Sequence, residues 1–219
     1  GGPAYVNAVK AAMGGTWQSH CEWNGPDWKN INGADTTAVG FNKGKALSRL
    51  GRAAEALESF GRSAELVKNA PETHYDMGVI HQELGNLGEA LKAYDRAVDI
   101  LGNDPDLWFN RGVVLAQMGK VDEAIKSYCR ALELNPEFRE ARVNVGILFM
   151  NQDRLREAQE SFDEVLKSAP GHMEALINKS AMLLRRKRYA DAERCLERAQ
   201  RIDPDRPEVW LNQAIALNS

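Results

Sequence analysis

The sequence repeats itself with a period of about 34 residues, and this periodicity constrains the fold more than any other feature. Copies begin at residues 37, 71, 105, 139 and 173, and a sixth begins at residue 207. Each copy contains two runs of apolar residues at helical spacing, separated by a short turn. In the third copy the turn contains Gly119, and the copy ends at Asn135-Pro136 because proline cannot continue a helix. The pattern therefore predicts a helix–turn–helix hairpin, repeated along the chain.

Three positions in each copy carry side chains of a fixed size, which indicates how the helices pack. Position eight is always small, and it is occupied by Gly44, Gly78, Gly112, Gly146, Ser180 and Ala214. Position twenty is always alanine, at Ala56, Ala90, Ala124, Ala158 and Ala192. Position twenty-four is large, at Phe60, Tyr94, Tyr128, Phe162 and Leu196. We expect the two helices of a hairpin to approach closely at the small residues, with the large residue filling the space between repeats.

These features resemble the tetratricopeptide repeat family over residues 37–219. The resemblance implies an all-α fold, an α-α superhelix (solenoid) of hairpins, with five repeats at residues 37–70, 71–104, 105–138, 139–172 and 173–206. Residues 207–219 then form the first helix of a sixth, truncated repeat. In an earlier repeat the residues equivalent to Trp210, Ala214 and Leu217 would face a second helix. We therefore expect the natural chain to continue, the alternative being that another molecule covers this surface.

Residues 1–36 do not fit the repeat. Pro3 and the pair Gly14-Gly15 predict a short helix over residues 3–13, followed by a loop rich in tryptophan at Trp17, Trp23 and Trp28. Each tryptophan can bury on the order of 200 Å², so we expect this segment to cap the first hairpin. The alternative is that the tryptophans reach a partner or lie in the groove of the repeat array itself. His20-Cys21 has no second ligand pair nearby, so no metal site is predicted.

Composition limits the class of protein. The net charge is −3, too close to zero to favour a nucleic-acid or membrane-surface partner. No apolar run approaches the roughly 18 residues that a membrane span requires. Cys21, Cys129 and Cys195 are widely spaced and predict neither a disulfide framework nor a zinc motif. We expect a cytoplasmic protein with no metal and no cofactor.

Helical geometry places positions two, five, six and nine of each repeat on one shared surface. In the family that this chain resembles, the corresponding surface lines a concave groove that receives peptides. Position six is occupied by Asn42, Asp76, Asn110, Asn144, Asn178 and Asn212. An asparagine side chain carries a donor and an acceptor, so it can pair with both polar groups of one peptide unit. The alternative is that asparagine is merely common at this position in the family and has a solvated or structural role.

The neighbouring positions are largely apolar. The predicted groove residues at positions five and nine are Phe41, Tyr75, Phe109, Val143, Ile177, Val113 and Ile147. Position two is mostly acidic, and position five is never basic, which disfavours the family members that clamp the acidic tails of chaperones. The predicted ligand is an extended or helical protein segment with apolar side chains, and with basic residues that meet the acidic rim.

The sequence predicts no catalytic site. Gly40–Ala46 lacks the spacing and the hydroxyl residue of a phosphate-binding loop, and His81 has no second histidine at metalloprotease spacing. The favoured interpretation is a non-enzymatic adaptor or scaffold that binds a partner segment. One alternative is the substrate-recognition arm of a larger enzyme, as in glycosyltransferases that carry similar repeats. Another is a scaffold that forms homo-oligomers through the Trp210 helix or the N-terminal tryptophans.

Overall fold

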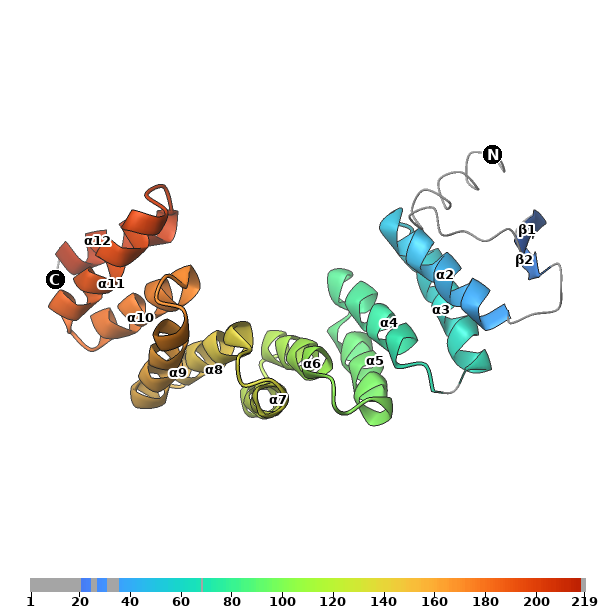
Figure 1. Ribbon diagram of the computed structural model, residues 1–219, viewed down its shortest axis with the longest axis horizontal. Helices are drawn as coiled ribbons and strands as arrows, with labels where there is room; N and C mark the ends of the chain where they lie inside the picture. The colour runs from blue at the N-terminus through green and yellow to red at the C-terminus, as the bar shows by residue number, and fades with distance from the viewer. Residues whose placement is uncertain (1–20, 25–26, 31–35, 68, 218–219) are drawn as a thin grey trace. The chain divides into compact units, whose positions relative to one another are not determined.

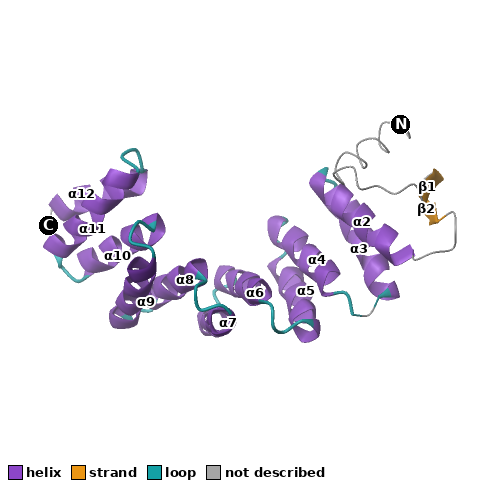
Figure 2. Ribbon diagram, in the orientation of Figure 1, coloured by secondary structure: helices purple, strands orange, loops and turns teal. Residues whose placement is uncertain are grey.

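The computed structural model describes residues 21–24, 27–30, 36–67 and 69–217 (Figures 1 and 2). The chain divides into two compact units, unit 1 at Gly1–Met118 and unit 2 at Gly119–Ser219. The division falls in the turn of the third repeat, so each unit is built from whole hairpins and one half of the third. The predicted all-α fold of stacked hairpins is confirmed.

In the part of unit 1 that the structure describes, there are two helical hairpins, one further helix and a pair of strands. Its elements are β1 (Cys21–Asn24), β2 (Asp27–Asn30), α2 (Thr36–Arg49), α3 (Ala53–Leu66), α4 (Pro71–Glu83), α5 (Leu87–Ile100) and α6 (Pro105–Gln117). Helices α2 and α3 form the first hairpin, α4 and α5 form the second, and α6 packs against α5. We call α2, α4 and α6 the first helices of unit 1, because each begins a repeat.

Unit 2 has the same organisation. Its elements are α7 (Val121–Leu134), α8 (Arg139–Asn151), α9 (Leu155–Ser168), α10 (Met173–Arg185), α11 (Tyr189–Ile202) and α12 (Pro207–Leu217). Helices α8 and α9 form one hairpin and α10 and α11 the next, and α12 packs against both α10 and α11. In unit 2 the first helices of the repeats, α8, α10 and α12, begin at Arg139, Met173 and Pro207, which are the predicted starts of these repeats.

The tryptophan-rich segment differs from the predicted loop. Residues 21–24 and 27–30 pair as antiparallel strands, with Trp23 opposite Trp28. The turn signal Asn24-Gly25-Pro26-Asp27 lies between them, and tryptophan favours strands. The predicted loop did not include this pairing of the residues on either side of the turn signal. The predicted helix over residues 3–13, Trp17 and His20 lie outside the described residues.

The turns inside the hairpins share one backbone conformation even where the sequence differs. Gly85 has a φ of 74°, and the amide of Asn86 then donates to the carbonyl oxygen of His81 at 2.8 Å. Lys187 takes a similar φ of 57°, and the equivalent bond joins Arg188 to Leu183 at 2.9 Å. In both turns this bond closes the last turn of the first helix and satisfies a carbonyl group that would otherwise lack a partner. The tertiary packing of the hairpin therefore holds a conformation that lysine does not prefer.

The size pattern of the repeat has a direct structural cause. A Cβ atom added at Gly44 would lie 2.6 Å from the ring of Phe60, and one at Gly146 would lie 2.6 Å from the ring of Phe162. Each of these two large residues thus lies on the glycine of its own hairpin, a contact that was not predicted. Phe60 also reaches the next repeat, because it shares a buried cluster with Ile80. The close approach of paired helices at position eight is confirmed for these hairpins.

Burial raises the pKa of the tyrosines among the large residues, and Tyr128 provides a test of this effect. Its side chain is buried, and removal from water raises the pKa of Tyr128 to about 12, although its hydroxyl group also accepts a bond from Asn144. In the unfolded chain the pKa is about 10. Between these two values the folded chain holds a proton that the unfolded chain has lost, so this contribution to stability disappears as the pH rises.

We expect the free energy of unfolding to fall between about pH 10 and about pH 12, and to fall less in Tyr128→Phe. Urea denaturation of both proteins across this interval measures the difference. The slope with pH is the relevant quantity, since the variant also loses a hydrogen bond. Equal slopes in the two proteins would contradict the assignment.

Candidate functional site

The first helices of unit 1 enclose a pocket on the surface predicted from positions two, five, six and nine. Its volume is about 420 Å³. It is lined by Phe41, Lys45, Pro71, Glu72, Tyr75, Asp76, Leu101, Asp104, Asp106 and Leu107. Of the predicted site residues, the structure therefore brings Phe41, Tyr75 and Asp76 together at one pocket.

Two aromatic rings form the apolar part of this pocket, and each is supported from behind. The ring of Phe41 packs against the buried ring of Phe60, with centroids 5.8 Å apart. The ring of Tyr75 packs against the buried ring of Tyr94 in the same way, at 5.9 Å. Because the supporting rings are fixed in the core, the half-buried rings of the pocket are held in place before any ligand binds.

Asp76 is the most unusual polar residue of the pocket. Its Oδ2 atom is shielded from solvent and has no hydrogen-bond donor among the described residues. Burial raises the pKa of Asp76, as does the charge of Glu72, while the Lys45 and Arg49 cations act in the opposite direction. A buried acceptor without a donor loses its bond to water and gains nothing in exchange. The sequence showed only that this repeat carries aspartate where the others carry asparagine.

The two position-six asparagines of unit 1 differ in exposure to solvent. Asn42 is exposed, whereas Asn110 is half-buried. The amide nitrogen of Asn110 donates to the carbonyl oxygen of Asp106 at 2.9 Å and to the hydroxyl group of Tyr75 at 3.4 Å. Both amide hydrogens thus have internal acceptors, and the Oδ1 atom is the group left for a ligand. Phe109 and Val113, on the same helix, are half-buried.

In unit 2, Asn144 and Asn178 are half-buried and also donate within the chain. Asn144 donates to the hydroxyl group of Tyr128 at 3.4 Å, and Asn178 donates to the carbonyl oxygen of Glu174 at 2.8 Å. Ile147 and Ile177 are half-buried and pack against the hydrophobic core.

Two predicted groove residues are covered, in contrast to the prediction. Val143 is 1% exposed and belongs to the core, because α8 packs against both α9 and α10. Asn212 is 9% exposed, and its amide donates to the hydroxyl group of Ser180 at 3.0 Å and to the carbonyl oxygen of Ile177 at 3.4 Å. Ser180 stands where the earlier repeats have glycine, so only this repeat offers Asn212 a hydroxyl partner.

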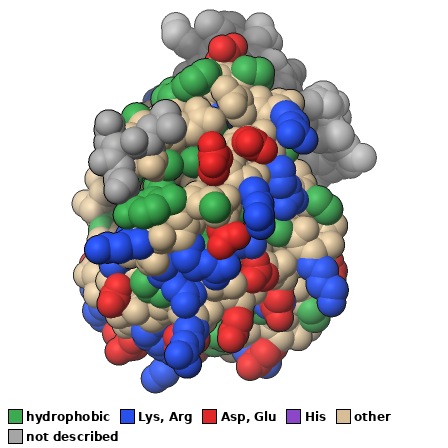
Figure 3. Space-filling view, turned by 90° about the vertical axis from the view of Figure 1, so that its left-hand side faces the viewer, with side chains coloured by type: hydrophobic (Ala, Val, Ile, Leu, Met, Phe, Trp, Pro, Cys, Tyr) green, Lys and Arg blue, Asp and Glu red, His purple; other side chains and the backbone are tan. Residues whose placement is uncertain are grey.

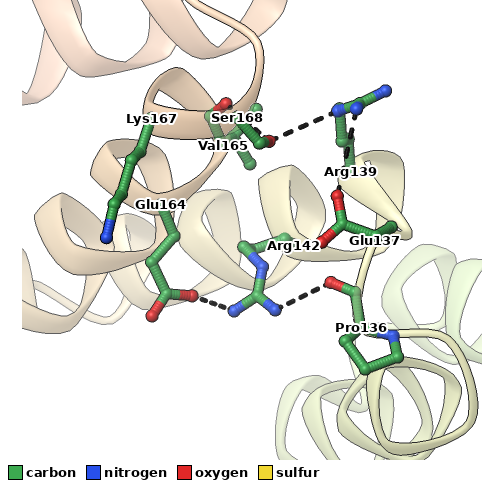
Figure 4. A pocket seen from close by; sticks show the side chains of 8 residues that line it. All are labelled: Pro136, Glu137, Arg139, Arg142, Glu164, Val165, Lys167 and Ser168. Carbon is green, nitrogen blue, oxygen red and sulfur yellow. Dashed lines mark hydrogen bonds and ion pairs between the residues drawn. The ribbon is translucent and has the colours of Figure 1, made fainter.

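A second pocket, which the sequence did not predict, lies in unit 2 where α8 begins and α9 ends (Figure 4). Its volume is about 490 Å³. Arg142 bridges the carboxylate of Glu164 and the carbonyl oxygen of Pro136, and Arg139 donates to the hydroxyl group of Ser168 at 3.4 Å (Figure 4). These arginines already have partners within the chain. Their hydrogen bonds link neighbouring helices, so this pocket is not assigned a binding role. No repeating position marks these residues in the sequence.

The surface at the C-terminal end of unit 2 mixes cationic, anionic and hydrophobic side chains (Figure 3). Helix α12 contributes exposed apolar groups, with Trp210 52%, Leu211 62% and Ile215 45% exposed. Among the residues that the structure describes, no group of three or more His, Cys, Asp or Glu side chains could hold a metal ion. Within the same residues, no helix combines the length and the apolar character needed to cross a bilayer.

Comparison with solved structures gives close matches in fold. The structure of YrrB, described as a TPR protein with an unusual peptide-binding site, is 26% identical, with a TM-score of 0.72 over 84% of this chain and 94% of that one. A tetratricopeptide repeat protein from Parabacteroides merdae is 20% identical, with a TM-score of 0.77 over 83% of this chain and 72% of that one. MamA from Desulfovibrio magneticus is 19% identical, with a TM-score of 0.73 over 80% of this chain and 98% of that one. Comparison with curated protein sequences gives no match.

Family comparisons agree with the periodicity and with these structures. The tetratricopeptide repeat family matches residues 105–138 and 143–207, and a further TPR repeat matches residues 83–119. The first of these ranges coincides with the third repeat read from the sequence. The matches, the periodic packing and the hairpin fold together show that the chain belongs to the tetratricopeptide repeat family.

Proposed function

We propose that this protein is a non-catalytic adaptor that binds a segment of a partner protein on the first helices of unit 1. The observation that carries the proposal is the pocket between α2, α4 and α6, whose aromatic walls are fixed by buried rings. A preformed apolar pocket with a few polar groups is the usual form of a binding site. Preorganisation also lowers the entropic cost of binding.

The asparagine beside the pocket supports recognition of a peptide backbone. The Oδ1 atom of Asn110 can accept a bond from a backbone N–H of the ligand, while its amide hydrogens stay on Asp106 and Tyr75. One such bond contributes roughly 0.5–1.5 kcal/mol net. A few such bonds with apolar anchors, less the cost of ordering a flexible peptide, correspond to an affinity on the order of micromolar.

Related proteins support the same class of function. Tetratricopeptide repeat proteins bind protein or peptide partners, and the structure of YrrB is described as having a peptide-binding site. For this chain the same role is our proposal, and the residues assigned to it are those of unit 1 described above.

A peptide selected on the intact protein from a random display library provides the probe. Replacing Asn42 and Asn110, the position-six asparagines of unit 1, together by alanine is expected to weaken its binding about fivefold to tenfold, because acceptor groups for the peptide backbone are lost. Calorimetric titration measures the dissociation constant, and circular dichroism checks that helicity is unchanged.

Asn103 and Asn151 provide the matched control, because both are exposed asparagines outside positions two, five, six and nine. Their replacement by alanine is expected to leave the affinity within about twofold. If the Asn42 and Asn110 double variant binds as tightly as this control, the peptide is recognised elsewhere on the protein and the proposal fails.

A further inference from the structure

We propose that the unit 1 pocket selects partner segments that present a lysine or arginine side chain, an inference that rests on the proposed function. The pocket recognises the cationic head group by a carboxylate and an aromatic face, while the stem of the side chain lies on the apolar walls. Three independent features of the pocket point to this chemistry.

The first feature is the balance of charge. Glu72, Asp76, Asp104 and Asp106 line the pocket, and Lys45 is the one cationic side chain among the described residues that line it. The carboxylate of Asp104 already accepts a bond from the backbone amide of Asp106 at 2.9 Å, because it caps α6. The other carboxylates give the pocket an excess of negative charge, which attracts a cation and repels an acidic segment.

The second feature is the missing donor at Asp76. The Oδ2 atom lies out of contact with solvent, and no donor reaches it from the described residues. The side chain of Asp76 lines the pocket, so a small turn of its carboxylate about the Cβ–Cγ bond brings this oxygen to an entering ammonium or guanidinium group, which supplies the missing donor. Bonds between a cationic donor and a carboxylate are about twice as strong as bonds between neutral groups. A purely apolar ligand would leave the same oxygen without a partner.

The third feature is a cation that the chain itself places at this wall. The Nζ atom of Lys45 lies 5.3 Å from the centroid of the Phe41 ring, which is within the range of a cation–π contact. The ring face is therefore accessible to an ammonium group. Since the side chain of Lys45 is exposed and flexible, it can move aside for a ligand cation without disturbing the core.

The repeat pattern isolates Asp76 as the residue to change. The other repeats carry asparagine at this position, so Asp76→Asn replaces the carboxylate by an isosteric amide that the fold already accommodates. Glu65→Gln is the matched control, because Glu65 is an exposed carboxylate on the second helix α3 and the change in net charge is the same.

Selection from a random library of peptides on the wild-type protein is expected to enrich lysine or arginine at one fixed position. The same selection on Asp76→Asn is expected to lose this enrichment, and Glu65→Gln is expected to keep it. One selected peptide is then compared with a copy that has norleucine or glutamine in place of its basic residue. For wild type the uncharged copy is expected to bind at least about tenfold more weakly, and for Asp76→Asn no more than about twofold more weakly.

The outcomes distinguish failure of this inference from failure of the proposed function. Peptides that bind and depend on Asn110, but show no basic residue or lose equal affinity on both proteins, overturn the inference and leave the proposed function standing. An equal loss in Glu65→Gln and Asp76→Asn also overturns the inference, because it reflects net charge alone. A library that yields no binding peptide overturns both.

Discussion

Replacing Phe162 by alanine is expected to lower the free energy of unfolding by about 3–5 kcal/mol. The side chain is 0% exposed, and it lies in one cluster with Val143, Leu176 and other core residues of unit 2. Its ring also covers Gly146, so truncation leaves a cavity that the neighbouring helices cannot fill without moving closer. Chemical denaturation followed by circular dichroism measures the loss.

Leu211→Ala is the control for this experiment. Leu211 is also a large apolar residue of unit 2, but it is 62% exposed. Its truncation is expected to change the free energy of unfolding by no more than about 0.5 kcal/mol. A similar effect of the two substitutions would mean that the ring of Phe162 is not the centre of the core, and the account of hairpin packing would be wrong.

The same chemical change, glycine to alanine, is expected to have opposite effects at two positions of unit 1. At Gly78 the new Cβ atom would lie 2.8 to 2.9 Å from three atoms of the Tyr94 ring, which is fully buried and cannot turn away. Overpacking of this kind costs about 1–3 kcal/mol. Gly78→Ala is therefore expected to destabilise the protein, even though alanine favours a helix more than glycine does.

At Gly61, inside α3, no atom other than those of the adjacent helix backbone lies within 4 Å of the added Cβ. Gly61→Ala is therefore expected to stabilise the protein by up to about 1 kcal/mol, through helix propensity alone. Thermal or chemical denaturation of both variants gives the sign directly. Effects of the same sign at the two positions would show that close packing does not explain the glycine at position eight.

The repeat and its packing could be predicted from the sequence because they depend on local rules. Helical spacing gives the hairpins, and the small residues at fixed positions, such as Gly44, predicted where the paired helices approach closely. The contact of the Phe60 ring with Gly44 was not predicted and appears only in the structure. The turn at Lys187 shows the limit of such rules, because a residue without a preference for positive φ is held there by the packing around it.

The site was predicted less completely, since it depends on which side chains bond to one another. Asn212 is covered because Ser180, in a different repeat position, provides a hydroxyl partner. The amide nitrogen of Asn110 donates to Asp106 and Tyr75, which leaves the Oδ1 atom as its acceptor for a ligand. No periodic pattern contains this information. Asp76 was visible as a departure from the pattern, but the missing donor at its Oδ2 atom appears only in the structure.

The most direct test of where this protein binds is a nuclear magnetic resonance titration of the isotope-labelled chain with a selected peptide. We predict that the signals that shift belong to α2, α4 and α6, including the side-chain amide of Asn110. Shifts confined to the second helices α3 and α5, with Asn110 unchanged, would contradict the assignment of the binding surface to the first helices of unit 1.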